Sequence, residues 1–209
     1  SAEGVILASL LLERSNIKNV LISSTSSFGT AERQFRYPLE YGIPKKQTTT
    51  LTVTGSGSMV LGKKTTDLKI TEATLGKVFD PGWNDVNDMG GAMSFAAYKT
   101  LKSHFENLGT KPSDYDLIIT GDLSIIGSNI LLDLFKEEGI EIKNHNDAGK
   151  IIYQREKQKA FCGGSGIACL PLVAYTKIYE KLKKKEYRKV LLAATGALFD
   201  PVYVQQKQS

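Results

Sequence analysis

The sequence is poor in the residue types that build metal sites and disulfide frameworks. It contains two cysteines, Cys162 and Cys169, and two histidines, and it has no CxxC or HExxH pattern. Two cysteines cannot form a framework of disulfides, and a reducing compartment fits this usage best. We therefore expect neither a structural metal site nor a metal cofactor.

Long apolar segments are also missing. No apolar run reaches the roughly 20 residues that a membrane-spanning helix needs, and no secretory signal pattern is present. With 41% hydrophobic and 23% charged residues, the composition is that of an ordinary globular protein with enough apolar residues for a core. The chain begins at Ser1 inside a helical pattern, so we expect it to be a piece of a longer protein.

The net charge of +5 is concentrated in one segment. Residues 177–189 hold seven basic and two acidic side chains, and seven minus two equals the whole excess of five. Two interpretations stay open: a solvated helix end whose cations lie near the negative pole of the helix dipole, or a surface for an anionic membrane or partner. Aromatic residues do not alternate with the basic ones as in a nucleic-acid platform, so we expect no nucleic acid.

Apolar periodicity and turn residues divide the first part of the chain into short elements. A broad apolar face predicts a helix over residues 1–14. Gly55-Ser56-Gly57 within strand material predicts a bulge or a close approach of two backbones. The turn Asp80-Pro81-Gly82 is the expected boundary between a first domain, 1–79, and a second, 80–209. The expected strands and extended segments are 20–22, 48–54, 58–61 and 68–79.

The second part of the chain alternates between helical and strand patterns. Gly109 is the expected C-cap of its first helix, and residues 121–124 should cap its second. His104 should pack within a helix, whereas His145 should lie in a surface loop. The expected elements, in order, are a helix over 91–108, a strand over 116–120, a helix over 127–138 and a strand over 151–153.

A glycine-rich turn is the most informative local feature. Gly163-Gly164-Ser165-Gly166 precedes an apolar helical segment in which we expect Cys169 to be buried. Glycines let a backbone approach its neighbour closely, and the free N–H groups at a helix start suit an anion or an oxyanion. The alternative is tight packing of the helix start against a sheet.

Polar and charged candidates lie in two other segments. Asp122 and Ser124 follow an expected strand, and sites in open α/β sheets form at the carboxyl ends of strands. Asp122 could equally cap a turn or the next helix. Arg33 and Arg36 could bind a carboxylate together, or could pair with the acidic residues beside them in an ordered loop.

A short unit occurs near both ends of the sequence. Residues 17–25 match residues 187–195 position by position. Each copy follows an amphipathic helix and leads into a turn of small residues. The recurrence of a helix, basic residues and a strand indicates a duplicated α/β unit and therefore two pseudo-symmetric halves.

Six segments, in order along the whole chain, carry a family resemblance: 31–38, 40–42, 52–57, 117–124, 163–166 and 194–198. They resemble the stage V sporulation protein AD family. The resemblance implies a thiolase-like α/β fold with two pseudo-symmetric halves in a layered αβαβα arrangement, the N-terminal half being incomplete in this chain. Family members carry an Ala-Cys-Ser segment at the nucleophile position before the position of Ser1, and a final strand after that of Ser209.

The resemblance also implies a function in spore-forming bacteria. The family is associated with uptake of dipicolinic acid, a pyridine dicarboxylate stored with calcium, into the forespore. We expect a non-catalytic binding protein that works with other stage V sporulation membrane proteins of the same operon. It would lie peripherally at the forespore or spore inner membrane, as a homodimer, with calcium present only as the salt of the ligand. The implied ligand-binding residues are Arg33, Arg36, Asp122, Ser124, Gly163, Gly164, Ser165 and Gly166.

The same resemblance argues against condensation chemistry. Condensing enzymes of this fold use a cysteine with His and Asn, or with His and a second Cys. Asp122 aligns with the His-bearing loop and Gly163 with the Asn-bearing turn, and neither supplies a neutral base or a side-chain oxyanion donor. Two alternatives stay open: an acyl-transfer enzyme that uses Cys162 or Cys169, and a scaffold whose residues 183–185 dock a membrane protein.

Overall fold

The fold is taken from a computed structural model, which describes residues 2–14, 16–31, 46–64, 66–197 and 206. Its strands are β1 (Asn19–Ser26), β2 (Thr50–Thr52), β3 (Gly55–Gly62), β4 (Leu117–Thr120), β5 (His145–Asp147), β6 (Gly163–Ser165) and β7 (Val190–Ala193). Its helices are α1 (Ala2–Arg14), α3 (Met89–Leu108), α4 (Ser124–Glu137), α5 (Ala148–Ile151), α6 (Cys169–Val173) and α7 (Tyr179–Lys183). Short turns form η1 (Phe28–Thr30), η3 (Pro112–Asp114) and the π-helical η4 (Ala174–Ile178).

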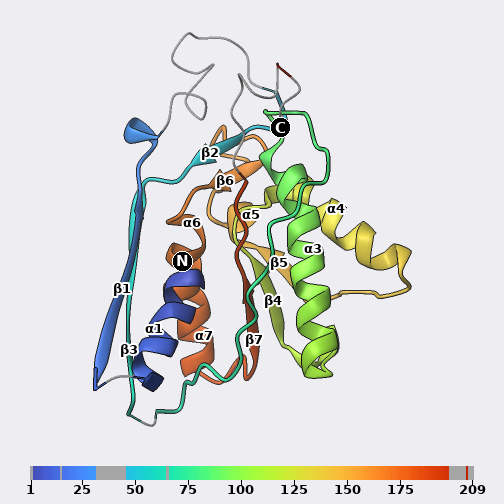
Figure 1. The fold of residues 1–209 in the computed structure, drawn as a ribbon. Coiled ribbons are helices and arrows are strands. Elements are labelled where there is room, and N and C mark those ends of the chain that lie inside the picture. The colour runs from blue at the N-terminus through green and yellow to red at the C-terminus, as the bar shows by residue number, and fades with distance from the viewer. Residues whose placement is uncertain (1, 15, 32–45, 65, 198–205, 207–209) are drawn as a thin grey trace.

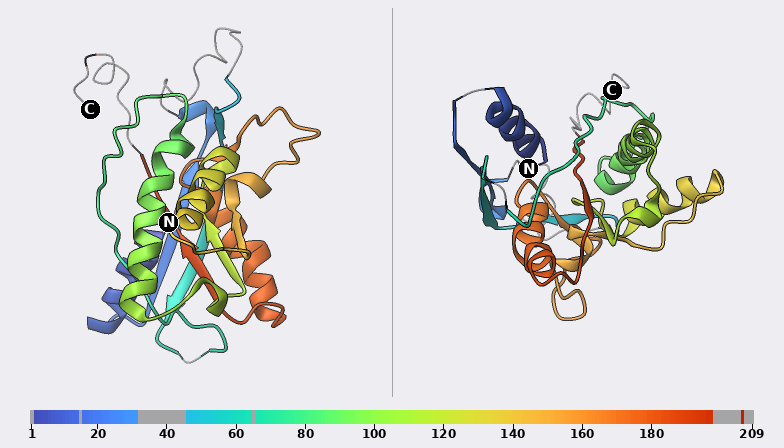
Figure 2. Two further views of the ribbon diagram at one scale, coloured as in Figure 1. Left: turned by 90° about the vertical axis from the view of Figure 1, so that its right-hand side faces the viewer. Right: turned by 90° about the horizontal axis from the view of Figure 1, so that it is seen from below.

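Sheets and helices alternate in layers (Figure 1). The antiparallel β1–β3 ribbon is followed by α1 with α6 and α7, then by a sheet in the order β5-β4-β7, and then by α3 and α4. The view from below in Figure 2 keeps this order. β4 pairs in parallel with both β5 and β7, and β2 pairs in parallel with β6. This layered α/β architecture with parallel sheets is the expected fold class.

Strand β4 divides the core into two clusters, because neighbouring side chains of a strand point to opposite faces. Ile118 joins the cluster with Leu101 and Phe135, from α3 and α4. Ile119 joins the cluster with Val173 and other residues of α6 and η4. Both isoleucines are 0% exposed, so β4 is buried on both faces and fixes the position of the loop that follows it.

Several local predictions are confirmed. The helix predicted over 91–108 is α3, and Gly109 ends it with a left-handed φ of 62°. In the turn before α3, the Gly82 N–H donates to Asp80 Oδ1 at 2.8 Å. The two matching units each form a strand after a helix, β1 after α1 and β7 after α7, although the two strands lie in different sheets. No helix in the described ranges is long and apolar enough to cross a membrane.

The glycines of β3 make a close approach and not a bulge. The β1–β3 register runs without interruption from Asn19↔Gly62 to Ser26↔Gly55. A Cβ atom on Gly57 would lie 2.5 Å from Pro171 Cβ, and one on Gly55 would lie 2.7 Å from a Leu172 methyl group. Helix α6 therefore packs directly on the backbone of β3.

Two local predictions need correction. Residues 151–153 form the end of α5 and a turn instead of a strand, because α5 is capped at Asp147 and runs through Ile151. Residues 68–79 form an extended segment, as predicted; it pairs with no described strand and runs along α3, where Thr74 bonds to His104. His145 lies in β5 and is half-buried, because its ring bonds to Thr120 of the neighbouring strand.

Candidate functional site

The loop between β4 and α4 is held by Asp147, a residue that the sequence analysis missed. Asp147 ends β5 and is 0% exposed. Its Oδ2 accepts from Thr120 Oγ1 at 2.6 Å and from the Leu123 N–H at 3.0 Å. Its Oδ1 accepts from the N–H groups of Ser124 at 2.9 Å and Lys150 at 3.2 Å. One carboxylate therefore caps the starts of two helices.

This capping role corrects the prediction that residues 121–124 cap the helix themselves. The donors lie in that loop, but the acceptor comes from a distant strand. The sequence does carry a signal for the cap of α5, since aspartate is a common N-cap and Asp147 directly precedes Ala148-Gly149. The contact with α4 is long-range and has no local signal. Burial raises the pKa of Asp147, although its four hydrogen bonds act in the opposite direction.

Asp122 joins the same loop to the glycine turn. Its Oδ2 accepts from Ser165 Oγ at 2.9 Å and from the Gly166 N–H at 3.0 Å. The residue is only partly covered, but its carboxylate faces inward, and burial raises its pKa to about 6. The nearby charge of Asp147 acts in the same direction. A protein carboxylate thus already bonds to two donors of the turn that the sequence suggested for an anion.

Ser124 and three glycines form a second, tightly packed part of the site. Ser124 has a left-handed φ of 57°, and its Oγ donates to the Gly164 carbonyl at 3.0 Å. Gly163 has a φ of 140°, and a Cβ atom there would lie 2.5 Å from Gly149 O and 2.9 Å from Ser124 Oγ. No larger residue fits where these backbones cross, so tight packing is part of what the glycine turn does.

The start of α6 is bonded to the end of β1 through Ser26. The Ser26 hydroxyl donates to the Val53 carbonyl at 2.7 Å and accepts from the Ala168 N–H at 3.3 Å. The Cys169 N–H donates to Gly166 O at 2.9 Å. Ser26 is a second residue that sequence reasoning missed, because a serine at a strand end carries no signal of a partner 142 positions away.

The two cysteines are free thiols that lie inside the protein. Cys169 is 0% exposed, which confirms its expected burial, and Cys162 is 3% exposed. The Ile126 N–H, in the first turn of α4, donates to Cys162 Sγ at 3.4 Å. Burial nevertheless raises the pKa of Cys162, and it raises that of Cys169 well above the usual range. Neither thiol is activated as a nucleophile in this arrangement.

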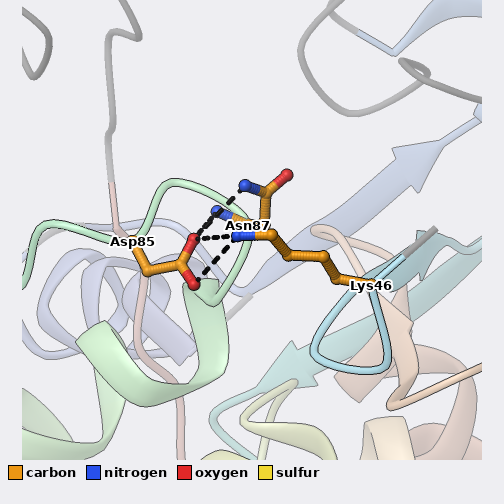
Figure 3. A network of polar contacts seen from close by, with 3 residues as sticks. All are labelled: Lys46, Asp85 and Asn87. Atoms are coloured by element: carbon orange, nitrogen blue, oxygen red, sulfur yellow. Dashed lines mark hydrogen bonds and ion pairs between the residues drawn. The ribbon is translucent and has the colours of Figure 1, made fainter.

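Arg33 and Arg36 lie outside the described residues, but both neighbours of that segment are placed. Ala31 lines the same cleft as Asp122. The Lys46 ammonium lies 3.4 Å from Asp85 in the turn before α3, and Asp85 also accepts from Asn87 (Figure 3). Burial alone would raise the pKa of Asp85, but the bonds from Asn87 and the charge of Lys46 lower it.

An open cleft is lined by residues of α1, β1, β3, α3, η4, α7 and β7. It runs from Asp122, Ser165 and Gly166 at one end to Lys183 at the other, and its volume is about 3610 Å³. Small-molecule sites usually have volumes of about 300–1,000 Å³, so the cleft alone does not locate a ligand. No three His, Cys, Asp or Glu side chains of the described residues are grouped as metal ligands.

Comparison with solved structures defines the class of protein. OleA from Xanthomonas campestris, solved with cerulenin, superposes with a TM-score of 0.58 at 15% identity, over 93% of this chain and 56% of that one. AbyA1, a tetronic acid condensing enzyme, superposes with a TM-score of 0.51 at 13% identity, over 86% of this chain and 56% of that one. At these identities the likeness shows the fold alone: the chain has the thiolase-like fold of condensing enzymes.

Sequence comparison identifies the family within this class. The family model of stage V sporulation protein AD (SpoVAD) matches residues 1–209. Stage V sporulation protein AD of Bacillus subtilis (strain 168) is 47% identical over 210 residues, which cover 100% of this chain and 62% of the relative. The chain belongs to the stage V sporulation protein AD family, as its motifs indicated, and spans less than two thirds of that relative's length.

Proposed function

We propose that this protein binds dipicolinate without catalysing a reaction and takes part in its uptake into the forespore. One observation carries the proposal: the Asp122 carboxylate bonds to Ser165 and Gly166 where the resemblance places the histidine loop of condensing enzymes. A carboxylate held there cannot act as the neutral base that condensation needs. The raised pKa values of both described thiols also support a binding role.

Dipicolinate is a rigid dianion, and the chain offers suitable donors. We assign its two carboxylates to Arg33 and Arg36, because a guanidinium can bind a carboxylate through two parallel hydrogen bonds. Both neighbours of the arginine segment support this assignment. Ala31 lines the same cleft as Asp122. The Lys46 carbonyl accepts from the N–H of Thr49, whose own carbonyl accepts from the Cys162 N–H beside the glycine turn. Ser165 and Gly166, which line the cleft beside Asp122, complete the wall of the proposed site, whereas buried Ser124, Gly163 and Gly164 hold the glycine turn in position.

Asp122 is the residue of this site that opposes ligand binding, since its carboxylate repels a dianion. We propose that it positions the glycine turn, with its partial protonation near its pKa of about 6 reducing the repulsion. Calcium would enter only as the salt of the ligand. The further proposals are peripheral attachment at the forespore inner membrane, work with other stage V sporulation membrane proteins, and a homodimer.

A second candidate function, acyl transfer, is favoured by the fold and by one contact. The N–H of Ile126 at the start of α4 donates to Cys162 Sγ, an arrangement that stabilises thiolates in other proteins. In such an enzyme the Cys162 thiolate would attack the thioester carbonyl of an acyl-CoA, so that the acyl group passes to Cys162 and CoA leaves as the free thiol. The near-complete burial of that thiol favours the binding function instead.

Calorimetric titration separates the two functions. Dipicolinate is titrated with and without calcium, phthalate serves as a dianion of different geometry, and an acyl-CoA is followed by intact-mass measurement. The proposal expects saturable binding of dipicolinate, much weaker binding of phthalate and no added acyl mass. Absence of dipicolinate binding would overturn the proposal, and an acyl adduct on Cys162 would establish the enzyme.

A further inference from the structure

The end of α7 carries a group of exposed cations, Lys183, Lys184, Lys185 and Arg188, named here the basic corner. The helix is closed by two backbone bonds: the Glu186 N–H donates to Lys181 O at 2.9 Å, and the Lys185 N–H donates to Leu182 O at 3.0 Å. This pattern is a Schellman-type C-cap, in which the residue after the helix takes a left-handed conformation. That residue is Lys185, with a φ of 60°.

A lysine at this position is unusual. Glycine is the common residue at a left-handed helix end because a Cβ atom there is strained. Among the described residues, only Ser124, Phe161 and Lys185 have a positive φ without being glycine, and the first two lie in or beside the glycine crossing. The chain therefore keeps a charged side chain where a smaller residue would give a more stable helix end, which indicates that the charge has a use.

The basic corner is also held in place. Asp116, just before β4, accepts from the N–H groups of Arg188 at 2.6 Å and Lys189 at 2.9 Å, and its own N–H donates to Lys189 O at 2.8 Å. The bonds from Lys189 and Arg188 lower the pKa of Asp116, so it stays ionised. The corner lies where β4 and β7 begin, at the opposite end of the sheet from Asp122 (Figure 1, lower end).

The neighbouring cations are already paired. Lys181 lies 3.7 Å from Glu186, and Lys189 lies 3.5 Å from Glu72 and 4.7 Å from the centre of the Tyr115 ring. Within the described ranges no carboxylate lies within 4.0 Å of the ammonium groups of residues 183–185.

We propose that the basic corner docks the protein onto an anionic phospholipid surface. Lys183 and Lys185 line the end of the open cleft away from Asp122, and all three lysines are exposed on flexible stems. Consecutive cations of this kind respond to charge density more than to shape, which fits fluid headgroups better than one folded partner. Tyr179 is 42% exposed, and its ring lies beside Lys183. An exposed tyrosine next to a lysine suits the layer of a membrane where headgroups meet acyl chains. This inference rests on the peripheral attachment within the proposed function and gives it a surface; it does not rest on dipicolinate binding, because the two sites lie at opposite ends of the sheet.

Vesicle sedimentation tests the inference, with the protein mixed with pure phosphatidylcholine or with phosphatidylcholine containing phosphatidylglycerol. We expect binding only to the anionic vesicles, decreasing as salt is added. The triple variant Lys183→Gln/Lys184→Gln/Lys185→Gln should bind on the order of a hundredfold more weakly. The matched control, Lys143→Gln/Lys157→Gln/Lys159→Gln, removes the same charge from exposed positions elsewhere and should bind like the parent.

Equal losses in the two triple variants would overturn the inference, since they would reflect net charge alone. So would a failure to bind the anionic vesicles, or equal binding to vesicles with and without phosphatidylglycerol. A single variant separates docking from helix stability: Lys185→Gly should bind vesicles about fivefold more weakly while melting at a higher temperature. A lower melting temperature would make Lys185 a helix-end stabiliser and contradict the inference.

Discussion

The two ends of the β5-β4-β7 sheet are built in opposite ways. At the carboxyl ends of the strands, the carboxylates of buried Asp147 and inward-facing Asp122 hold the loops through specific hydrogen bonds to backbone N–H groups. At the other end, exposed lysines project from a loop that is fixed through its backbone by Asp116. A single substitution at the first end should change stability strongly. At the second end each substitution should have a small effect, and the effects of several should add.

The largest effect is expected at Asp147. Replacing it with alanine leaves the N–H groups of Leu123, Ser124 and Lys150 and the Thr120 hydroxyl without their acceptor in the interior. Each orphaned donor costs about 1–3 kcal/mol, although not additively, so Asp147→Ala should lower the free energy of unfolding by about 4 kcal/mol. Urea unfolding measures it.

Asp133→Ala is the matched control for this variant. Asp133 is exposed on α4, and its replacement should change stability by less than about 0.5 kcal/mol. Equal stability of the Asp147 and Asp133 variants would show that the capping network contributes nothing.

A second large effect is expected where the backbones cross. A Cβ atom on Gly149 would overlap the Gly164 carbonyl oxygen and lie 2.6 Å from Ser124 Oγ. Since neither neighbour can move without breaking its bonds, Gly149→Ala should destabilise the fold by about 2–3 kcal/mol. Gly196→Ala is the control, because nothing lies within 4 Å of its added Cβ atom. A neutral Gly149 variant would disprove the close packing.

Asp122 and His145 should have opposite effects on the pH dependence of stability. The pKa of Asp122 is raised from 3.8 to about 6. Its contribution to the free energy of unfolding is therefore full below pH 3.8 and is lost as the pH rises through 6. Burial lowers the pKa of His145 from 6.5 to about 4, so its contribution is full above pH 6.5 and is lost as the pH falls through 4. Between pH 4 and 6 the two effects cancel in part.

Single variants should separate the two titrations. Relative to the parent, Asp122→Asn should gain stability as the pH rises from 4 to 6, by up to about 3 kcal/mol, since each pKa unit corresponds to about 1.4 kcal/mol. His145→Gln should change in the opposite direction. Urea unfolding at four pH values between 4 and 7.5 measures both; curves parallel to that of the parent would contradict the assignment.

The smallest effect is expected at the basic corner. Lys185→Gly relieves the left-handed conformation and should raise stability by about 1 kcal/mol. Lys184→Gly removes the same charge from a residue with a φ of −77° and should lower stability slightly. Thermal unfolding compares the two, and a shift of the same sign in both would place the effect in charge and not in the backbone.

The same contrast explains what the sequence could predict. Local patterns predicted α1, α3 with its Gly109 cap, and the cations of the basic corner, because each depends on neighbours within a few positions. The roles of Asp147 and Ser26 depend on contacts 23 and 142 positions away, and no local pattern encodes them. His145 was misplaced for this reason: its polar neighbours indicate a loop, but pairing with β4 makes it a strand.

The fold class came from motifs and not from periodicity. The sequence of the glycine turn alone could not decide between tight packing and anion binding. The structure shows why, because different glycines of the turn have different roles. Gly163 is required by a backbone crossing, while the Gly166 N–H is bonded to Asp122. In the proposed function the ligand donors include Arg33 and Arg36, which the sequence offered as a carboxylate-binding pair and which lie outside the described residues.

The most direct test of the proposed function is a dipicolinate titration of three proteins: the parent, Arg33→Ala/Arg36→Ala, and the triple lysine variant of the basic corner. The account predicts saturable binding by the parent and the lysine variant, with affinity at least tenfold lower in the arginine variant. Unchanged binding by the arginine variant, or loss in the lysine variant, would contradict a specific site at the Asp122 end.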